Sequence, residues 1–473
     1  MTWSARYNRL LYFAVIVVGG VALGRMVPSI NNPWSIVLGV VAVVLGALVY
    51  RRRGFYGLLV MHAWLLWYPL VVQPLSTIGG PLTRDATLAE LVFVVAGALV
   101  ALRTFVRPKD SALGAAPAVW VLLVSAGWLL TISVAPASLT LPSLRHVLYY
   151  LLLLVLCAEF VKTSSQAWGL IWGVMVSLMI QHGVVFWGQH LGGLPFYSVG
   201  LGSVQQDVSR LHGVYTLPGA MPVEVWGSRA SGLLAMVAAI LLLTALYGPR
   251  RNRTAVLSLF TLTGAMLLFT GGRAGWLGFI LGLTVVLIVA IRSVHLSTLR
   301  GAVSIATVGG LAAVVYAATG FLNADFWSRA VSLGAVTQES SWISRLRFWR
   351  LATDLLIANP FGIGFDTLLA RYGVFEHNAF LWLVNGAGPL GLATFCAVWG
   401  LVAFRSAVLV KSGSRETALI GAVSLVALTV VLVAGTAENT PFLSEGAWIV
   451  WGAAIGVESS SRRHTAEEGS AVS

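Results

Sequence analysis

The stretch MLLFTGGRAGWLGFILG, residues 266–282, decides what kind of chain this is. It joins two apolar runs, 254–270 and 274–291, through two glycines and one arginine, Arg273. Each run has about the length that a helix needs to cross a bilayer, roughly 17 to 25 mostly apolar residues. The stretch therefore predicts two membrane helices joined by a tight turn, with an arginine at the head of the second helix.

The composition of the 473-residue chain extends this prediction to the whole molecule. Hydrophobic residues make up 58% of it and charged residues only 10%, well below the roughly 25% of soluble domains. Its two cysteines, Cys157 and Cys396, lie in apolar runs without metal-ligand spacing, so they support neither a disulfide framework nor a zinc site. We expect an all-α, polytopic integral membrane protein whose first apolar run, preceded by Arg6 and Arg9, is a retained helix.

The length rule gives fourteen candidate spans, and we expect about 12 to 14 transmembrane helices. The spans are 10–25, 33–50, 55–74, 87–106, 113–132, 146–161, 168–187, 229–247, 254–270, 274–291, 302–321, 378–404, 417–435 and 445–457. None of them has the pattern of a strand. The polar tail ESSSRRHTAEEGSAVS, from residue 458, is expected to be disordered.

Short basic loops set the expected orientation. With a cytoplasmic N-terminus, the loops at 51–54, 103–110 and 248–253 all lie inside, and two long segments, 188–228 and 322–377, lie in the periplasm. The expected organisation is N-terminal transmembrane helices (1–187), a periplasmic loop (188–228), core transmembrane helices with arginine motifs (229–321), a long periplasmic loop (322–377), C-terminal transmembrane helices (378–457) and a cytoplasmic tail (458–473).

The basic residues expected on the outer side are all arginines, because the three lysines, Lys109, Lys162 and Lys411, fall inside. The outer arginines are Arg84, Arg145, Arg210, Arg229, Arg273, Arg329, Arg345, Arg347, Arg350 and Arg371. The planar guanidinium group matches phosphate and carboxylate oxygens with two parallel hydrogen bonds. An outer phosphate ligand is one interpretation, and interfacial anchoring of each arginine among lipid headgroups is the other.

Three local patterns carry the candidate chemistry. In GSRASGLL, 227–234, a long loop returns to the membrane with Arg229 at a helix start, where free backbone N–H groups favour an anion. In TGGRAGWLG, 270–278, Arg273 heads the next helix. In SRLRFWRLATDLLIANPFGIGFDT, 344–367, apolar residues at helical spacing (Phe348, Leu351, Ala352 and Leu355) predict a helix that Asn359–Pro360 ends and a flexible loop at Gly362 and Gly364. FEHNAFLWLVNGAGPLGL, 375–392, then places His377 where the chain returns to the membrane.

In their order and spacing, these motifs resemble the O-antigen ligase and polymerase superfamily, over about 229–395. The resemblance implies a GT-C-like membrane glycosyltransferase of the bacterial inner membrane, with its active site facing the periplasm. It would transfer a glycan from undecaprenyl diphosphate to a sugar hydroxyl of the lipid A core in lipopolysaccharide biosynthesis, with inversion and without a metal or cofactor. Membrane lipids would surround it, and no nucleic acid is expected as a partner.

The resemblance also implies roles for single residues. Arg229 and Arg273 match the diphosphate-binding arginines and His377 matches the catalytic base, while Arg345 matches the arginine that opens the outer-loop helix. Arg347, Trp349, Glu376 and Asn378 are further candidates for binding or orienting the substrate. The family usually has a serine before the arginine of the turn motif, where this chain has Gly272.

Elementary chemistry is consistent with these roles. Fixed arginines near a low-dielectric boundary stabilise the charge that grows on a leaving diphosphate. A histidine, with an unperturbed pKa of about 6.5, suits the task of taking a proton from a sugar hydroxyl. If His377 is structural, the base is to be sought among Glu376, Asp366 and His212.

Other functions stay open at this point. A polymerase would join the glycan to another lipid-linked repeat, and a protein-directed glycan ligase would use a protein acceptor. A membrane transporter ranks last, because it predicts broken helices or ionisable groups within the spans, where the sequence has only His62 and Glu90.

Overall fold

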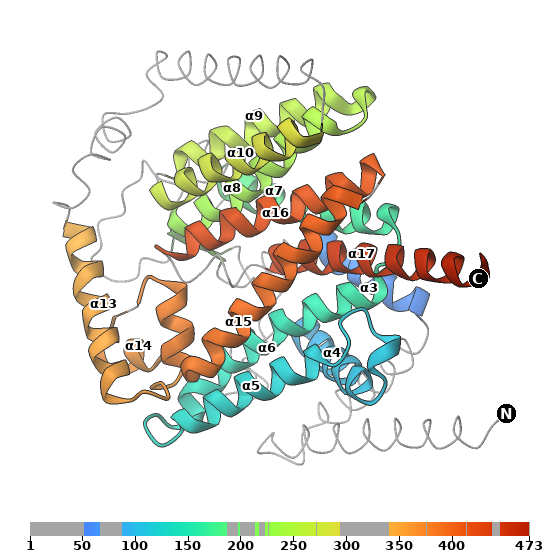
Figure 1. The fold of residues 1–473 in the computed structure, drawn as a ribbon. Helices are drawn as coiled ribbons and strands as arrows, with labels where there is room; N and C mark the ends of the chain where they lie inside the picture. Colours follow the sequence, from blue (N-terminus) through green and yellow to red (C-terminus); the bar gives the residue numbers. More distant parts are fainter. Residues whose placement is uncertain are drawn as a thin grey trace, which may run out of the picture.

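The computed structural model describes residues 52–66, 88–186, 197–198, 213–216, 223–225, 227–270, 272–293, 340–374, 376–412, 414–437 and 445–472, and Figure 1 shows these as a bundle of helices. The α-helices of these ranges are α3 (Arg52–Trp64), α4 (Leu88–Val106), α5 (Ala116–Thr131), α6 (Ala137–Phe160), α7 (Ser164–Phe186), α8 (Gly227–Tyr247), α9 (Arg253–Phe269), α10 (Arg273–Ser293), α13 (Ser340–Ala358), α14 (Thr367–Tyr372), α15 (Ala379–Ser412), α16 (Arg415–Gly435) and α17 (Glu445–Val472). Two short 3₁₀ helices, η3 (Pro108–Asp110) and η5 (Arg250–Asn252), lie in the connections.

Five of these helices are long and apolar enough to cross a membrane. They comprise Ala137–Phe160, Ser164–Val184, Ala230–Tyr247, Ala379–Lys411 and Arg415–Gly435. Shorter apolar helices accompany them in the described residues, such as Ala116–Thr131 and Arg253–Leu268. The chain is therefore a helical, multi-pass membrane protein. The expected spans 10–25, 33–50 and 302–321 lie outside the described residues, as do Arg84, Arg210, Arg329 and His212.

Most predicted boundaries agree with the structure, but the helix expected at 146–161 begins earlier. This helix, α6, begins at Ala137 and contains Pro142 and Arg145, both of which precede the predicted span. Pro142 lies close enough to the start of the helix that little of the hydrogen-bond ladder is lost. Arg145 is buried, at 5% exposure, with Nη2 2.6 Å from Nε2 of His146. The arginine that the sequence assigned to the outer side is thus part of the helix packing.

The long helix α15 is broken, although the sequence predicted one continuous span. Ala387 and Gly388 have non-helical backbone angles, and Pro389 begins the second segment. The left-handed φ of 64° at Gly388 is accessible to glycine at little cost. The GAGP sequence at this point is a signal for a break that the hydropathy of the segment masks.

A small antiparallel sheet lies in the segment 188–228, where no strand was predicted. Its strands are β1 (Tyr197–Ser198), β2 (Gly213–Thr216) and β3 (Val223–Val225), in the order β1-β2-β3. Tyr197 pairs with Thr216, and Val214 pairs with Glu224. The all-α prediction describes the bundle, and this loop is its exception.

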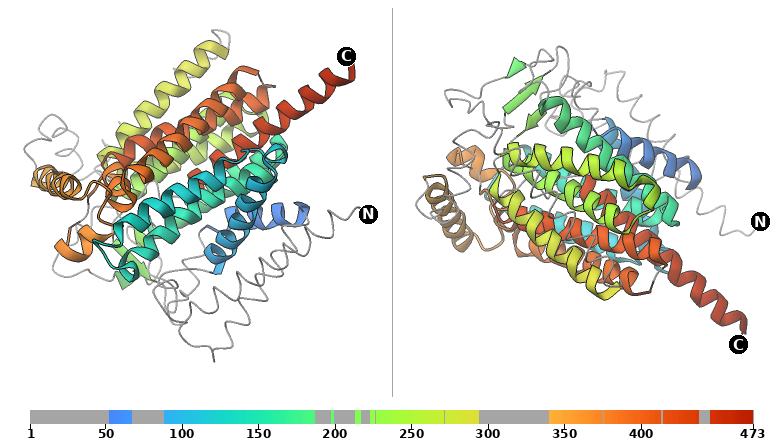
Figure 2. Two further views of the ribbon diagram at one scale, coloured as in Figure 1. Left: turned by 60° about the horizontal axis from the view of Figure 1, so that its bottom comes forward. Right: turned by 90° about the horizontal axis from the view of Figure 1, so that it is seen from above.

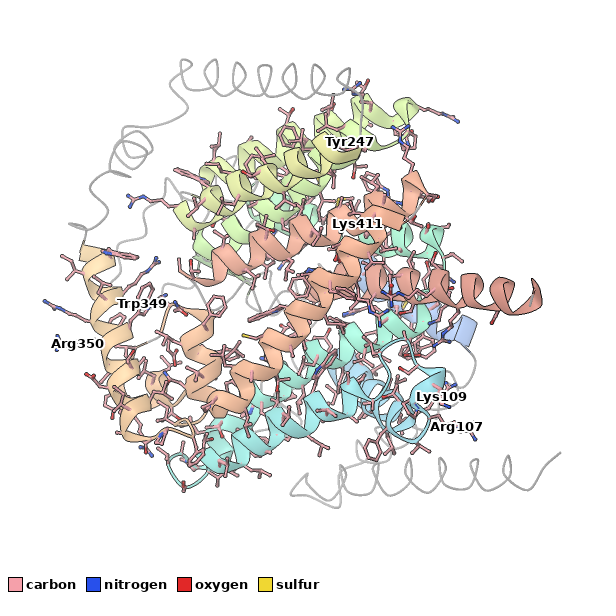
Figure 3. The ribbon with its side chains drawn as sticks, viewed as in Figure 1. Arg107, Lys109, Tyr247, Trp349, Arg350 and Lys411 are labelled. Carbon is pink, nitrogen blue, oxygen red and sulfur yellow. The ribbon has the colours of Figure 1, made fainter. Side chains whose placement is uncertain are left out.

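Helices from distant parts of the sequence pack side by side (Figures 1 and 2). In the bundle α8 packs against α9, α10 and α16, while α15 joins this group to α5. Helix α17 packs against α6 and α7, with Trp448 and Trp451 fully buried. Figure 3 shows Arg107, Lys109 and Lys411 toward one end of the bundle and Arg350 of α13 at the opposite end. We call these the basic end and the α13 end.

The polar tail continues α17 as a helix, so the expected disorder is wrong for residues 458–472. Glu458 is buried at 1% exposure and pairs with Arg405 of α15 and with Arg462 one turn further along. The Ser459 hydroxyl donates to the carbonyl of Ala112 over 3.2 Å. These contacts give the first part of the tail partners that its composition does not reveal.

Candidate functional site

Helices α8 and α10 begin at the same level, because a close contact fixes their register. A Cβ on Gly275 would lie 2.4 Å from the backbone carbon of Ser231, so only glycine permits this approach. Further along, a Cβ on Gly282 would lie 3.7 Å from the Cβ of Ala239. In both contacts the residue of α10 follows its partner in α8 by nearly the same number of positions along the chain, which means that the two helices run parallel. Arg229 and Arg273 are separated by a similar number of positions, and they lie in the first turns of α8 and α10.

The end of α16 lies beside this pair of helix starts. A Cβ on Gly278 would lie 3.2 Å from the carbonyl oxygen of Val430, and one on Gly282 would lie 3.6 Å from Cγ1 of Val426. Residues further along α10 thus face residues nearer the start of α16, so the two helices are antiparallel. The last turn of α16 therefore reaches the level of Arg273.

Asn378 connects the start of α15 to the end of α16. Its Oδ1 accepts hydrogen bonds from the backbone N–H groups of Phe380 and Leu381, each over 3.0 Å, as an N-cap does. Its Nδ2 donates to the carbonyl oxygen of Thr436, which follows α16, over 3.1 Å. His377 precedes Asn378 in the chain, and it is thereby held near the level at which α8 and α10 begin.

The electrostatics of this junction favour an anion. The positive N-terminal ends of α8, α10 and α15 lie at one level, with the end of α16 in contact with α10 and α15, and the arginines of α8 and α10 add full charges. The side chain of Arg273 is partly buried, whereas that of Arg229 lies outside the described part of the chain. The structure thus places the backbone positions of three predicted site residues, Arg229, Arg273 and His377, at one level of the bundle.

His377 has an unusual backbone conformation. Its φ is 45°, in the left-handed region that few residues other than glycine adopt. Its ring is partly buried and stacks on Phe348 of α13, with ring centroids 6.4 Å apart and planes at 26°. The preceding residue, Glu376, is buried at 3% exposure. Helix α13, predicted from the sequence as part of a functional loop, therefore covers the candidate base.

The faces of α13 separate the candidate residues on it. Phe348, Leu351, Ala352 and Leu355 are the buried or half-buried positions, as the predicted periodicity requires, and α13 ends at Ala358, directly before the predicted Asn359–Pro360 stop. Arg345 is half-buried, and its spacing places it on the same face.

Arg347 and Arg350 are exposed, on the opposite side of α13, and Figure 3 shows Arg350 pointing away from the bundle. Trp349 packs edge to face on Trp342, with centroids 5.5 Å apart. Its indole N–H is buried and has no acceptor among the described residues. Of the α13 candidates, Arg345 and Trp349 are on the side of His377, and Arg347 is not.

The NPFGIG loop holds α13 in place. The N–H groups of Ile363 and Gly364 donate to the carbonyl oxygen of Asn385 over 2.7 and 3.0 Å, at the break in α15. The carboxylate of Asp366 accepts hydrogen bonds from the Ser143 hydroxyl and from the indole N–H of Trp382. Asp366, an alternative base in the sequence analysis, is thus a structural link between α6, α14 and α15.

Two other histidines have structural partners. His182 is buried, and its Nδ1 lies 2.7 Å from the carbonyl oxygen of Leu178. Nε2 of His62 lies 2.9 Å from the hydroxyl of Tyr149 and 3.3 Å from Oε2 of Glu445. Tyr149 is at the centre of α6, so this cluster lies in the middle of the bundle. The sequence analysis named His62 but not Glu445, because a single acidic residue at the end of a span carries no signal of a partner elsewhere in the chain.

Asn385 is a further polar residue that the sequence analysis missed. Its side chain is buried at 1% exposure, and neither amide atom has a hydrogen-bond partner among the described residues. In the same part of the chain, no group of three His, Cys, Asp or Glu side chains is arranged as a metal site.

Comparison of the chain with protein-family models and with curated proteins finds no match. The candidate site is therefore interpreted from its own geometry.

Proposed function

We propose that this protein is a membrane glycosyltransferase of the O-antigen ligase type, which transfers a glycan from undecaprenyl diphosphate to a sugar hydroxyl of the lipid A core. The observation that supports it most directly is the shared level of three helix starts, which carry Arg229, Arg273 and His377. A lipid diphosphate needs cationic groups at a membrane boundary, and a glycosyl acceptor needs a base beside them.

The reaction can be written with these residues alone. The acceptor oxygen attacks the anomeric carbon and forms the new glycosidic bond, while the bond from this carbon to the diphosphate oxygen breaks. The diphosphate leaves with the electron pair, and its growing charge is stabilised by Arg229, Arg273 and the N-terminal ends of their helices. His377 takes the proton of the acceptor hydroxyl. A single displacement of this kind inverts the anomeric configuration.

The surroundings of His377 suit a positioned base. Its left-handed backbone conformation is of the kind that occurs at functional sites, held in place by neighbouring contacts. The cap formed by Asn378 holds the backbone next to His377, and the ring itself stacks on Phe348. On α13, the indole N–H of Trp349, which has no acceptor among the described residues, is a candidate donor to a sugar hydroxyl.

The break in α15 bears on the transporter alternative. Broken membrane helices in transporters line substrate sites. In this chain, the backbone of the NPFGIG loop occupies the break, since a Cβ on Gly388 would lie 2.4 Å from the carbonyl oxygen of Phe361. Because protein backbone occupies the break, it leaves no room there for a transported substrate. This favours an enzyme over a transporter. Between ligase and polymerase, the net charge of +13 and the arginine-only outer side favour a phosphorylated acceptor such as the lipid A core.

The test is the surface glycolipid profile of cells that lack this protein. A ligase predicts lipid A core without glycan, together with long glycan chains left on the lipid carrier. Core that carries a single repeat would indicate a polymerase, and an unchanged profile would refute both. Purified protein supplied with the lipid-linked glycan and lipid A core should then form the product.

A further inference from the structure

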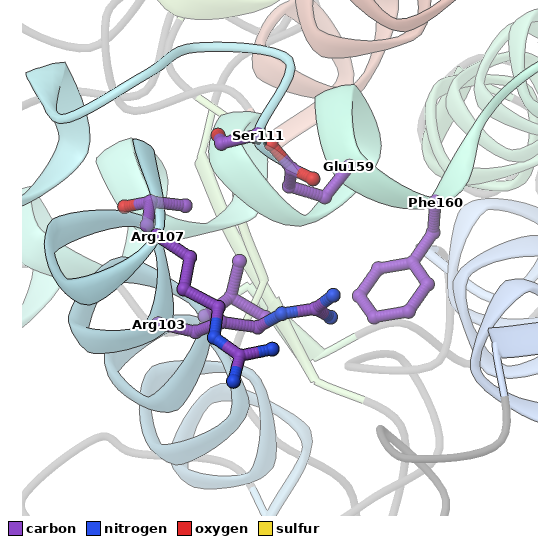
Figure 4. A pocket seen from close by; sticks show the side chains of 7 residues that line it. Arg103, Arg107, Ser111, Glu159 and Phe160 are labelled. Carbon is purple, nitrogen blue, oxygen red and sulfur yellow. Dashed lines mark hydrogen bonds between the residues drawn. The ribbon is translucent and has the colours of Figure 1, made fainter. Parts of the chain in front are cut away.

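A surface pocket lies at the basic end of the bundle, remote from the candidate catalytic site. It is formed by the last turns of α4, the connection that follows η3, and the end of α6 (Figure 4). The residues that line it are Val100, Arg103, Thr104, Arg107, Ser111, Glu159 and Phe160. The pocket is shallow and open to solvent, so a ligand would bind against its surface.

Arg103 and Arg107 provide the charge of this pocket. Arg103 lies in the last turn of α4 and Arg107 directly follows this helix, and both side chains line the pocket. Figure 4 shows Arg103 extending toward Phe160 and Arg107 extending from the chain that leaves α4. Neither guanidinium forms an ion pair or hydrogen bond with any residue that the structure describes. Two guanidinium groups that line one pocket and have no partner among the described residues are suited to the oxygens of a phosphate group.

Glu159 lines the same pocket, but its carboxylate is already used by the neighbouring loop. Its Oε1 accepts hydrogen bonds from the Ser111 hydroxyl and from the N–H of Ala112, each over 2.5 Å. These bonds hold the loop against α6 and leave Arg103 and Arg107 as the cationic groups of the lining. The single negative charge of Glu159 leaves the pocket lining, with its two arginines, net positive.

The position of the pocket identifies the source of the phosphate. Apolar side chains on the same turns of α4 are exposed, namely Leu102 (41%), Phe105 (59%) and Val106 (59%). In a membrane protein, such side chains at the end of an apolar helix face lipid tails. A ligand that carries a phosphate next to acyl chains matches both surfaces. We propose that Arg103 and Arg107 bind the phosphodiester headgroup of an anionic phospholipid.

The experiment measures lipid binding to the full-length protein after removal of its native lipids in a neutral detergent. Phosphatidylglycerol and, separately, phosphatidylcholine are titrated, and bound lipid is counted by native mass spectrometry. The test variant is R103Q/R107Q. The control variant is R251Q/R253Q, which removes the same charge from the η5 connection and the start of α9, where neither side chain has a partner among the described residues.

R103Q/R107Q should bind phosphatidylglycerol about thirtyfold more weakly, since two arginines near an anionic lipid surface each contribute about fivefold. The control and the wild type should bind alike, and phosphatidylcholine binding should not change. An equal loss in both variants would mean that overall charge, not this pocket, attracts the lipid, and would overturn the proposal.

Two further measurements keep the proposal testable. R103K/R107K retains the charge and is expected to fold, but it should lose a substantial part of the preference for phosphatidylglycerol, because the ammonium group cannot form the bidentate contact. Wild-type affinity in this variant would overturn the role of the guanidinium forks. Inorganic phosphate should bind far more weakly than the lipid, and equal binding would overturn the assignment to a phospholipid.

Discussion

Arg229 and Arg273 can be tested with substitutions that keep their charge. Arg229→Lys and Arg273→Lys each retain a cation at a helix start but lose the two parallel hydrogen bonds to a diphosphate. We expect each change to lower glycan transfer by purified protein by about a hundredfold, as the loss of a fixed donor to a developing oxyanion does. Initial rates at saturating acceptor concentration give the measurement.

The matched control for these variants is Arg350→Lys, on the exposed side of α13. It should transfer glycan at the wild-type rate. Wild-type rates in both Arg229→Lys and Arg273→Lys would remove bidentate diphosphate binding from the proposal.

His377 separates catalysis from binding. General base catalysis contributes about a hundredfold to ten-thousandfold, so His377→Ala should lower turnover by a factor in this range. Binding of the lipid diphosphate donor should change little, because the arginines remain. Turnover and donor affinity are measured on the same preparation. If turnover stays within a few-fold of the wild type, His377 is structural, and Glu376 becomes the next base to test.

At the scale of single elements, the break in α15 is a rigid joint between the NPFGIG loop and the bundle. Gly388→Ala places a methyl group on a left-handed residue and 2.4 Å from the carbonyl oxygen of Phe361. We expect a loss of unfolding free energy of about 1 to 3 kcal/mol, through backbone strain and the displaced loop. Thermal unfolding in detergent, followed by circular dichroism, measures the change.

Gly400→Ala is the control within the same helix, since no atom lies within 4 Å of the position its Cβ would take. It should leave the unfolding temperature unchanged or raise it slightly, because alanine favours a helix over glycine. Equal behaviour of the two variants would show that the break is not under steric constraint.

The contact between α8 and α10 sets the relative level of two candidate arginines. Gly275→Ala would force a Cβ against the backbone of Ser231, so the two helix starts must move apart or shift along each other. We expect donor affinity to fall while the protein still folds. Gly264→Ala on α9, with no atom within 4 Å of its added Cβ, is the control and should bind the donor normally. Unchanged donor affinity in Gly275→Ala would mean that this register does not matter for binding.

For the whole molecule, the two ends of the bundle should lie on opposite sides of the membrane. The experiment uses inside-out vesicles of the inner membrane, whose periplasmic face lies inside. A cysteine in place of Arg350, which is exposed on α13, should react only after the vesicles are opened. A cysteine at Lys109, exposed at the basic end, should react without opening them. Both are introduced into a chain with Cys157→Ala and Cys396→Ala, and an impermeant thiol reagent is used. The reverse pattern of reactivity would refute the proposed orientation.

Hydropathy was sufficient to predict the helices of the described bundle, because burial in lipid requires long apolar segments. The face of α13 that packs was predicted as well, since Phe348, Leu351, Ala352 and Leu355 share one side of a helix. The start of α6 and the break in α15 were missed. Pro142 lies near the start of α6, where a proline costs little, and the apolar residues around the GAGP sequence masked the break in α15.

The residue types of the candidate site could be chosen from sequence motifs, but their arrangement could not. The register of α8 and α10 depends on the meeting of Gly275 and Ser231, and Asn378 reaches the end of α16 across the bundle. That Arg345 lies on the packed side of α13 and Arg347 on the exposed side becomes clear only when the buried side of this helix is known. The pairing of His62 with Glu445 likewise joins residues at distant positions in the chain.

Helix α17 has a consequence for how the protein is assembled during synthesis. It fills a position against α6 and α7, and its Trp448 contributes to the buried core, although it follows those helices by more than half of the chain. Until α17 emerges from the ribosome, the apolar surfaces that it covers on α6 and α7 must be shielded by lipid or by the insertion machinery. Glu458 then fastens the completed bundle through Arg405. The contacts that α17 makes with α6 and α7 can therefore form only late in synthesis, long after those two helices have been made.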